Sequence, residues 1–115
     1  MADWDTVTEL AGELPEVEAG TSYGTPALKV RGKGFARLRE DGETLVVQVD
    51  ILEREALIQE DPGTFYITPH YEDYPAMLVK LATVDADELR ELLIESWRMR
   101  APKRLLRAYD ELADE

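Results

Sequence analysis

The chain has 115 residues, of which 44 % are hydrophobic and 33 % charged, and its formal net charge is −12 at pH 7. This length suits one hydrophobic core, so we expect a single domain over residues 1–115. No apolar run approaches the roughly 20 residues that cross a bilayer, and the acidic balance opposes non-specific attraction to nucleic acid or anionic lipid. Without cysteine or a signal-peptide pattern at the start, we expect a cytoplasmic monomer.

The N-terminal segment predicts one helix followed by a turn-rich stretch. Asp3 can cap this helix, which ends before Pro15 and whose apolar residues recur at the 3.6-residue period: Trp4, Val7, Leu10, Ala11 and Leu14. Residues 17–19 are expected to form a short extended piece. Glycines and a proline then indicate a loop, at Gly20, Gly24 and Pro26.

The next segment predicts a meander of three antiparallel strands. Leu28 and Val30 alternate with Lys29 and Arg31, which is typical of a half-buried strand. Residues 32–34 supply a turn into a second strand, residues 35–39. Asp41-Gly42 is a second hairpin signal, and residues 44–49 form the third strand.

Capping signals divide the remaining chain into helices and strands. Asp50 with Glu53, and Asp85 with Glu88, have the spacing of a capping box, so helices are expected over residues 51–60 and after Asp85. Two strands lie between these helices, at residues 65–68 and 77–84, joined by the loop 69–76. Pro102 ends the long helix and starts a last one.

These elements predict an α+β fold with a five-stranded antiparallel sheet, in the order α-β-β-β-α-β-β-α-α. Periodicity places apolar residues of the strands and of the long helix in one core. The expected members of this core are Leu28, Val30, Val47, Val79, Leu81, Leu93 and Trp97.

Motifs along nearly the whole chain carry a family resemblance. The chain resembles the YjbR/MmcQ family at Leu14-Pro15, residues 21–26, Leu28-Lys29-Val30, Phe35-Ala36, residues 68–71, Tyr74-Pro75, Trp97-Arg98 and residues 101–103. The resemblance implies a small α+β domain comparable with frataxin-like CyaY folds and described as a double-wing arrangement. It also implies a DNA-binding label that rests on structural analogy, and no established set of catalytic residues.

Ten of the thirteen basic residues fall in two short windows without acids, residues 29–39 and 98–109. They define a candidate basic patch that could contact phosphates: Lys29, Arg31, Lys33, Arg37, Arg98, Lys103 and Arg104. The alternative is that each window is a solvated face offset by nearby carboxylates. Nucleic acid is therefore a possible partner that the net charge disfavours.

The loop 69–76 is unusually rich in aromatic residues and could line a cleft for a small ligand or a protein. Apolar walls with a few polar groups are the usual composition of a pocket. The candidate cleft residues are Tyr23, His70, Tyr71, Tyr74 and Trp97. We expect the loop to be ordered and to lie against the junction at residues 97–103. The alternative is that these residues lie at the edge of the core, with the ring buried and the polar group in contact with solvent.

Neither a metal centre nor catalysis is expected. Glu9 and Glu13 share a helix face, but such spacing is common on solvated helices. No serine or threonine has an evident base, and no glycine-rich loop precedes a helix. The sequence therefore predicts a non-catalytic binding or adaptor domain with no cofactor and no membrane partner. DNA binding through residues 28–39 and 98–107 is the alternative.

Overall fold

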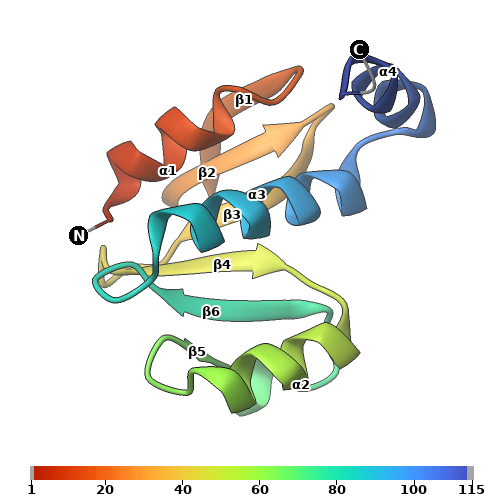
Figure 1. The fold of residues 1–115 in the computed structure, drawn as a ribbon. Helices are drawn as coiled ribbons and strands as arrows, with labels where there is room; N and C mark the ends of the chain where they lie inside the picture. Colours follow the sequence, from red (N-terminus) through yellow and green to blue (C-terminus); the bar gives the residue numbers. More distant parts are fainter. Residues whose placement is uncertain (1, 114–115) are drawn as a thin grey trace.

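One antiparallel sheet organises the chain, and the structure, a computed structural model, describes residues 2–113 of it (Figure 1). The six strands follow the order β1-β2-β3-β4-β6-β5. Their bounds are β1 Val17–Ser22, β2 Thr25–Val30, β3 Lys33–Leu38, β4 Thr44–Gln48, β5 Phe65–Tyr66 and β6 Ala76–Lys80. The helices are α1 Trp4–Ala11, α2 Ile51–Glu60, the short 3-10 helix η1 Pro69–Tyr71, α3 Ala86–Arg100 and α4 Lys103–Ala113. The α+β class agrees with the sequence prediction.

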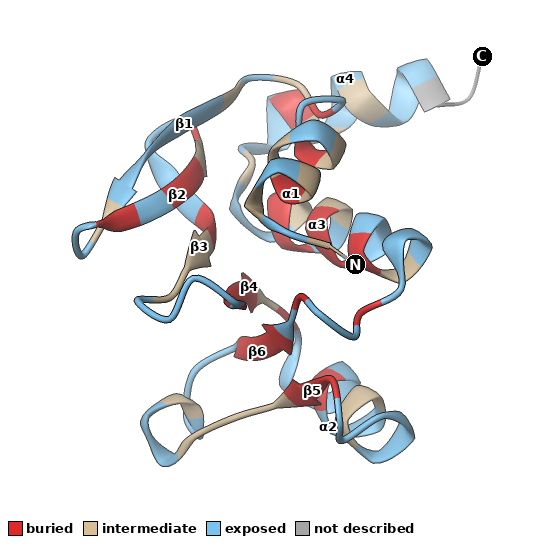
Figure 2. Ribbon diagram, turned by 90° about the vertical axis from the view of Figure 1, so that its left-hand side faces the viewer, coloured by how far each residue is buried: buried red, intermediate tan, exposed pale blue. Residues whose placement is uncertain are grey.

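The helices α1 and α3 cover one face of the sheet. Helix α3 packs on β3 and β4 and against α1, while α2 packs at the β5–β6 end. Figure 2 shows α1 and α3 on one side of the strands, with the β1–β2 hairpin and the β5–β6 connection reaching to the other side. None of the helices in the part of the chain that the structure describes is long and apolar enough to cross a membrane.

The main core lies between the sheet and these helices. Every core residue expected from the sequence belongs to it, and its largest side chains, Trp97, Phe35 and Phe65, are almost completely buried. A second, smaller cluster lies on the opposite face of the sheet. It consists of Val46, Ala76 and Leu78, with Tyr66 and Tyr71 packed against it.

The capping predictions are confirmed at both aspartates. Asp50 accepts hydrogen bonds from the backbone N–H groups of Leu52 and Glu53, and Asp85 accepts from those of Asp87 and Glu88. A complete capping box occurs at the start of α1, where the side chains of Asp3 and Thr6 each accept from the backbone N–H of the other. The three helices therefore begin where local signals place them.

The sheet has six strands rather than five, because residues 17–22 form the full strand β1. Four consecutive β1 residues are exposed, so the strand lacks the alternating burial that its sequence would need to reveal it. Backbone pairing with β2 over all six residues holds it in place. The turn falls at Tyr23-Gly24, where φ is +53° and +79°, the conformation of a two-residue type I′ hairpin.

Several other boundaries differ from the sequence prediction. Helix α1 ends at Ala11, and β2 begins at Thr25 although the sequence predicts a loop as far as Pro26. The β2–β3 turn is Arg31-Gly32, with φ of +51° and +81°, so β3 begins at Lys33 and ends at Leu38. Strands β5 and β6 are shorter than expected. Pro69 opens η1 and ends the extended backbone after β5, and backbone bonds from Thr83 and Val84 to Lys80 turn the chain after β6.

Candidate binding cleft

A cleft of about 710 Å³ opens on the face of the sheet opposite α1 and α3. Ala27 of β2, Val46 of β4 and Ala76 of β6 contribute small apolar side chains to it. Its rim comes from the β1–β2 turn, strand β3, the β5–β6 connection and the end of α3. These contribute four aromatic or imidazole rings and two guanidinium groups: Tyr23, His70, Tyr71, Tyr74, Arg37 and Arg100.

Tyr23 stands at the tip of the β1–β2 hairpin in a strained conformation. A left-handed backbone costs a side chain with a Cβ roughly 1–2 kcal/mol, and this position has a φ of +53°. Packing of the side chain offsets little of this cost, because the residue is 88 % exposed. Its ring does meet the guanidinium of Arg37, whose Cζ lies 5.4 Å from the ring centroid.

Arg37 of β3 is held in the cleft by three further contacts. Its Nη1 donates to Thr25 Oγ1 at 3.2 Å, and its Nη2 donates to the Tyr71 hydroxyl at 3.4 Å. The carboxylate of Glu40 lies 3.5 Å from Nη1. The guanidinium is therefore fixed between the β1–β2 hairpin and the aromatic loop before any ligand arrives.

The aromatic loop, residues 67–75, carries a small group of rings. The ring of His70 meets Tyr71 edge-on, with centroids 5.0 Å apart, and lies 5.9 Å from the ring of Tyr74. Tyr71 is half-buried against the second core cluster, while His70 and Tyr74 are exposed. The loop presents its rings to the cleft, and Arg100 of the expected neighbouring junction, residues 97–103, lines the same cleft.

Arg54 of α2 anchors this loop, and sequence reasoning missed it. The residue is 4 % exposed. Its Nη1 donates to the carbonyl oxygens of Tyr71, Tyr74 and Ala76 at 3.0, 2.7 and 3.0 Å, and its Nη2 donates to that of Glu72 at 3.0 Å. The sequence did contain one signal of a structural role for Arg54. Arg54 is the lone basic residue of an otherwise acidic helix, and it shares the inward side with Leu57 and Ile58.

Arg100 brings the second basic window to the same cleft. It is the last residue of α3, and its Nη2 donates to Gln48 Oε1 at 3.1 Å. Arg37 comes from the first window, so the two windows meet here through one arginine each. The sequence analysis did not include Arg100 among its candidate residues.

Trp97 does not line the cleft, which corrects the sequence prediction. The side chain is fully buried in the main core, where its Nε1 donates to the Pro15 carbonyl at 3.1 Å and its ring packs against Tyr109 of α4. The position one helical turn from Leu93 places Trp97 on the face of α3 that packs onto the sheet. Of the expected cleft residues, Tyr23, His70, Tyr71 and Tyr74 do come together.

Three of the other six members of the candidate basic patch lie beside carboxylates. Arg31 pairs with Glu16 at 2.6 Å and Arg98 with Asp110 at 2.8 Å. Lys29 lies opposite Glu18 in the β1–β2 ladder. Three members lie exposed outside the cleft: Lys33, Lys103 and Arg104. The Arg98 hydrogen bond lowers the pKa of the Asp110 carboxyl below its ordinary value, so this acid stays charged beside the basic window.

The acidic residues in and after α1 do not gather into a metal site. Helix α1 ends at Ala11, so Glu13 lies in the turn that follows and does not share a helix face with Glu9; it pairs with Arg90 at 2.8 Å. Within residues 2–113, no group of three or more histidine, aspartate or glutamate side chains is arranged to hold a metal ion.

The fold and cleft together define a small α+β domain whose sheet is covered by helices on one face and bears a ring-lined hollow on the other. The YjbR family model matches residues 12–99, and the chain belongs to the YjbR family. The sequence is 34 % identical to uncharacterized proteins of Mycobacterium tuberculosis (Rv2570) and Mycobacterium bovis (Mb2600), over 95 % of this chain and 96 % of each relative.

A solved structure has the same fold. The crystal structure of Deinococcus radiodurans protein DR2400, which carries a DUF419 domain, is 26 % identical to this chain and superposes with a TM-score of 0.72. The match covers 84 % of this chain and 77 % of that one.

Proposed function

We propose that this chain is a non-catalytic cytoplasmic binding module that takes a planar, negatively charged ligand group into the cleft. The observation that carries the proposal is the meeting of four rings with two arginines around an apolar floor. Rings stack on planar groups, and guanidinium groups bind carboxylate or phosphate through paired N–H donors. The cleft volume of about 710 Å³ falls within the range of small-molecule sites.

The strain at Tyr23 supports a role in recognition. A bulky residue with positive φ persists only where something compensates for its cost, and here packing does not, because the ring is largely in solvent. The Arg37 guanidinium lies over one face of this ring, so a planar ligand group would stack on the other face. The strained turn thus holds a ring where a ligand needs it.

The surroundings of His70 favour binding over catalysis. Its ring neighbours are Tyr71 and Tyr74, which are stacking partners. A general base instead needs a nucleophile and an orienting group within hydrogen-bond reach. His70 is therefore assigned to the ring cluster of the rim.

Single-stranded nucleic acid is the second candidate ligand, and one observation favours it. Arg37 and Arg100 bring both basic windows to a surface where Tyr23 and Tyr74 are exposed for stacking. Stacked bases beside backbone-tracking cations are the usual mode of single-strand binding. The net charge of −12 and the carboxylate partners of Arg31 and Arg98 place this candidate after a small ligand.

The experiment follows backbone and arginine NH signals by NMR while three probes are added. A nucleoside monophosphate carries both a ring and a charge, its nucleoside only the ring, and inorganic phosphate only the charge. We expect the monophosphate to shift signals of Tyr23, Arg37 and Tyr74 at millimolar or lower concentration, and each half alone to bind more weakly. Absence of cleft shifts with all three probes at about 10 mM would contradict the proposal.

A matched pair of variants tests the location. Arg100→Gln removes a charge from the cleft, whereas Arg104→Gln removes the same charge outside it. We expect only the first variant to weaken binding of the monophosphate. For the second candidate, a short single-stranded oligonucleotide should bind at about 50 mM salt with a steep loss of affinity as salt increases.

A further inference from the structure

A second groove, of about 680 Å³, lies between α2 and α3 and shares one lining residue, Gln48, with the cleft. Two of its lining residues belong to the main core, Val49 after β4 and Leu92 of α3, and a third, Leu57 of α2, packs against that core. Val49 and Leu92 are buried, Leu57 is partly exposed, and Ala56 beside it is exposed. The floor of this groove is therefore apolar and reaches the surface between the two helices.

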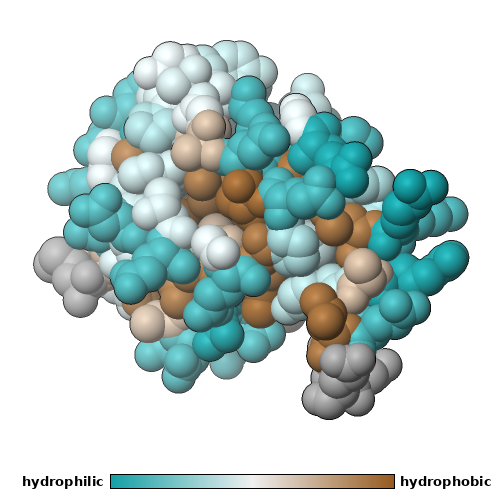
Figure 3. Space-filling model, turned by 90° about the horizontal axis from the view of Figure 1, so that it is seen from above, coloured by the Kyte–Doolittle hydropathy of each residue, from teal (hydrophilic) through white to brown (hydrophobic). Residues whose placement is uncertain are grey.

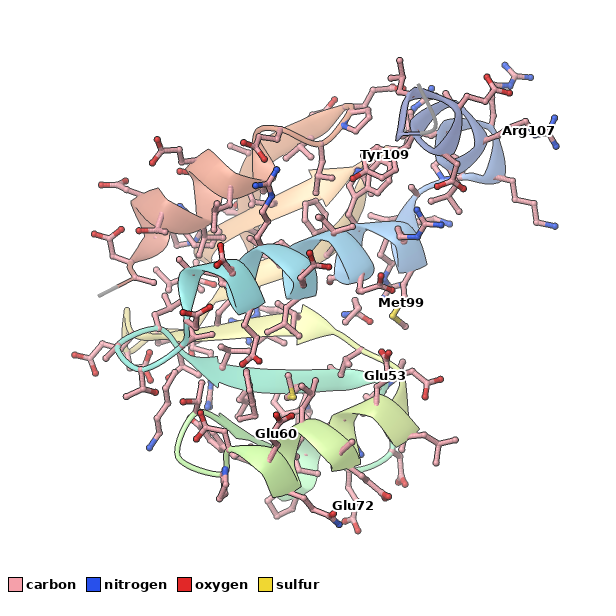
Figure 4. All side chains as sticks on the ribbon, viewed as in Figure 1. Glu53, Glu60, Glu72, Met99, Arg107 and Tyr109 are labelled. Carbon is pink, nitrogen blue, oxygen red and sulfur yellow. The ribbon has the colours of Figure 1, made fainter. Side chains whose placement is uncertain are left out.

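The rim of the groove is acidic on both sides. Glu53 comes from α2, and four acids come from α3: Asp87, Glu88, Glu91 and Glu95. The spacing of Glu88, Glu91 and Glu95 follows one side of a helix over about 10 Å. Figure 4 shows Glu53 and Glu60 on the edge of α2 that points toward α3. The two acidic edges therefore flank the same apolar floor.

No cation of the chain compensates these acids within the groove, since the described residues that line it include no lysine or arginine. Each arginine of the two helices is engaged with another group. Arg54 donates to the aromatic loop, Arg90 pairs with Glu13, Arg98 pairs with Asp110, and Arg100 donates to Gln48 at the end of the groove. Burial, together with the nearby charges of Glu60, Asp61 and Asp85, raises the pKa of Glu88. The groove thus holds repelling like charges over an apolar floor.

We propose that this groove docks a basic amphipathic helix of a partner protein, with apolar side chains on the floor and lysine or arginine against the two rims. Charge complementarity fixes the sign of the partner, because only cations relieve the repulsion between the rims. The apolar floor excludes a purely electrostatic contact and requires apolar residues between the cations. This is a different surface from the cleft, and the proposal does not depend on the cleft ligand.

The walls of the groove determine that the partner is helical. Both walls are helices, whose backbone N–H and C=O groups are already used in their own hydrogen bonds. An extended peptide would find few backbone partners there and would leave its own polar groups buried and unpaired. A helix satisfies its backbone internally and presents one apolar stripe, as in other helix-in-groove complexes.

The test uses the full chain and a designed peptide of about 18 residues, a helix with a leucine stripe flanked by lysines. A peptide of the same composition in scrambled order keeps the charge and loses the stripe. We expect the helix to shift NMR signals of Leu57, Leu92 and Glu91, and to bind at least about tenfold more tightly than the scrambled peptide. Equal affinity for the two peptides would overturn the proposal, as would shifts confined to the cleft.

Two matched variants locate the charge effect. Glu53→Gln and Glu55→Gln remove the same charge from the same helix, but only Glu53 lines the groove. We expect the first to weaken peptide binding severalfold and the second to leave it unchanged. Glu91→Gln with Glu95→Gln should weaken binding further, with folding checked by thermal unfolding. If these variants leave peptide affinity unchanged, the proposal is wrong.

Two other occupants would be recognised by separate measurements. Sedimentation of the free chain at increasing concentration detects self-association, and loss of any dimer in the Glu91→Gln, Glu95→Gln variant would assign the groove to a second copy. Calcium or magnesium alone, added without peptide, would shift the same acidic residues if the groove collected divalent cations. Either result, without groove binding of the helical peptide, would overturn the assignment to a basic helix.

Discussion

The side-chain oxygen of Ser96 accepts a hydrogen bond from the backbone N–H of Gln48, at 2.8 Å. The same hydroxyl donates to the carbonyl of Phe35, and Ser96 is fully buried. Continuing the β3–β4 register would place Gln48 opposite Phe35, so the serine of α3 stands where a ladder bond would otherwise form. One hydroxyl therefore joins two strands and locks the helix to them.

Ser96→Ala should destabilise the fold by about 1–3 kcal/mol, because a buried backbone donor and acceptor both lose their partner. Urea unfolding measures the loss, and hydrogen exchange at Gln48 should accelerate. Ser22→Ala, at the end of β1, is the control and should change stability by less than about 0.5 kcal/mol. An equal effect of the two substitutions would contradict the bridging role of Ser96.

Arg54→Met should release the aromatic loop, because methionine fills similar space and donates no hydrogen bond to the four carbonyls. We expect a loss of about 2–3 kcal/mol, since hydrogen bonds from a charged donor are among the stronger ones. NMR signals of residues 69–75 should broaden while those of α1 and α3 stay in place. Arg54→Lys keeps the charge but loses the planar fork, and should give an intermediate loss. Unaltered loop signals in Arg54→Met would be inconsistent with the anchor.

Tyr23→Asn should stabilise the fold and weaken ligand binding at the same time. Asparagine tolerates positive φ and precedes glycine in the preferred type I′ turn, so about 1–2 kcal/mol of strain is relieved. Loss of the contact with Arg37 removes about 0.5–1 kcal/mol, which leaves a net gain. Thermal unfolding and the nucleoside monophosphate titration check the two effects. Tyr74→Asn, without positive φ, should weaken binding with no gain in stability.

Glu88→Gln should raise stability at neutral pH. Because burial raises the pKa of Glu88 above its ordinary 4.5, the folded state binds this proton more tightly than the unfolded state, and its contribution to stability falls as pH rises through that window. The gain in Glu88→Gln should therefore be complete above the raised pKa, shrink as pH falls toward 4.5, and be lost below that pH. Unfolding curves at several pH values measure it.

Asp41→Asn should change the stability of the fold in the opposite direction from Glu88→Gln. The backbone N–H of Glu43 and the Thr44 hydroxyl hold the pKa of Asp41 below its ordinary 3.8. Its charged form therefore stabilises the fold above that pH, and this contribution disappears as pH falls through the lowered pKa. The asparagine variant should be less stable at neutral pH and should approach the parent in acid. If the stability change relative to the parent had the same sign and the same pH dependence in both variants, the assigned pKa shifts of Glu88 and Asp41 would both be contradicted.

Local signals explain which parts of the fold could be predicted from the sequence. Asp50 and Asp85 cap helices through neighbours two and three residues away, so their roles are visible in any window of the chain. Strand β1 depends on pairing with β2 and has no alternating burial of its own. Its sequence therefore indicated only the short extended piece at residues 17–19 and not the full strand.

The cleft was predicted in part for a similar reason. Aromatic identity suggested Tyr23, Tyr71, Tyr74 and Trp97 alike, yet only the first three face the cleft, because the helical period of α3 directs Trp97 to the core. Arg54 contacts carbonyls 17 to 22 residues further along the chain. Such a contact depends on the tertiary fold and leaves no spacing pattern in the sequence.

The anchor of the aromatic loop has a consequence for how its specificity could change. Arg54 reaches only main-chain oxygens of residues 71, 72, 74 and 76, and every amino acid possesses that atom. The side chains at positions 72–74 can thus be exchanged without loss of the hydrogen bonds from Arg54. The backbone of the loop therefore stays anchored whatever side chains stand at these positions. Selection from a library randomised there should change ligand preference while the sheet and helices stay unchanged.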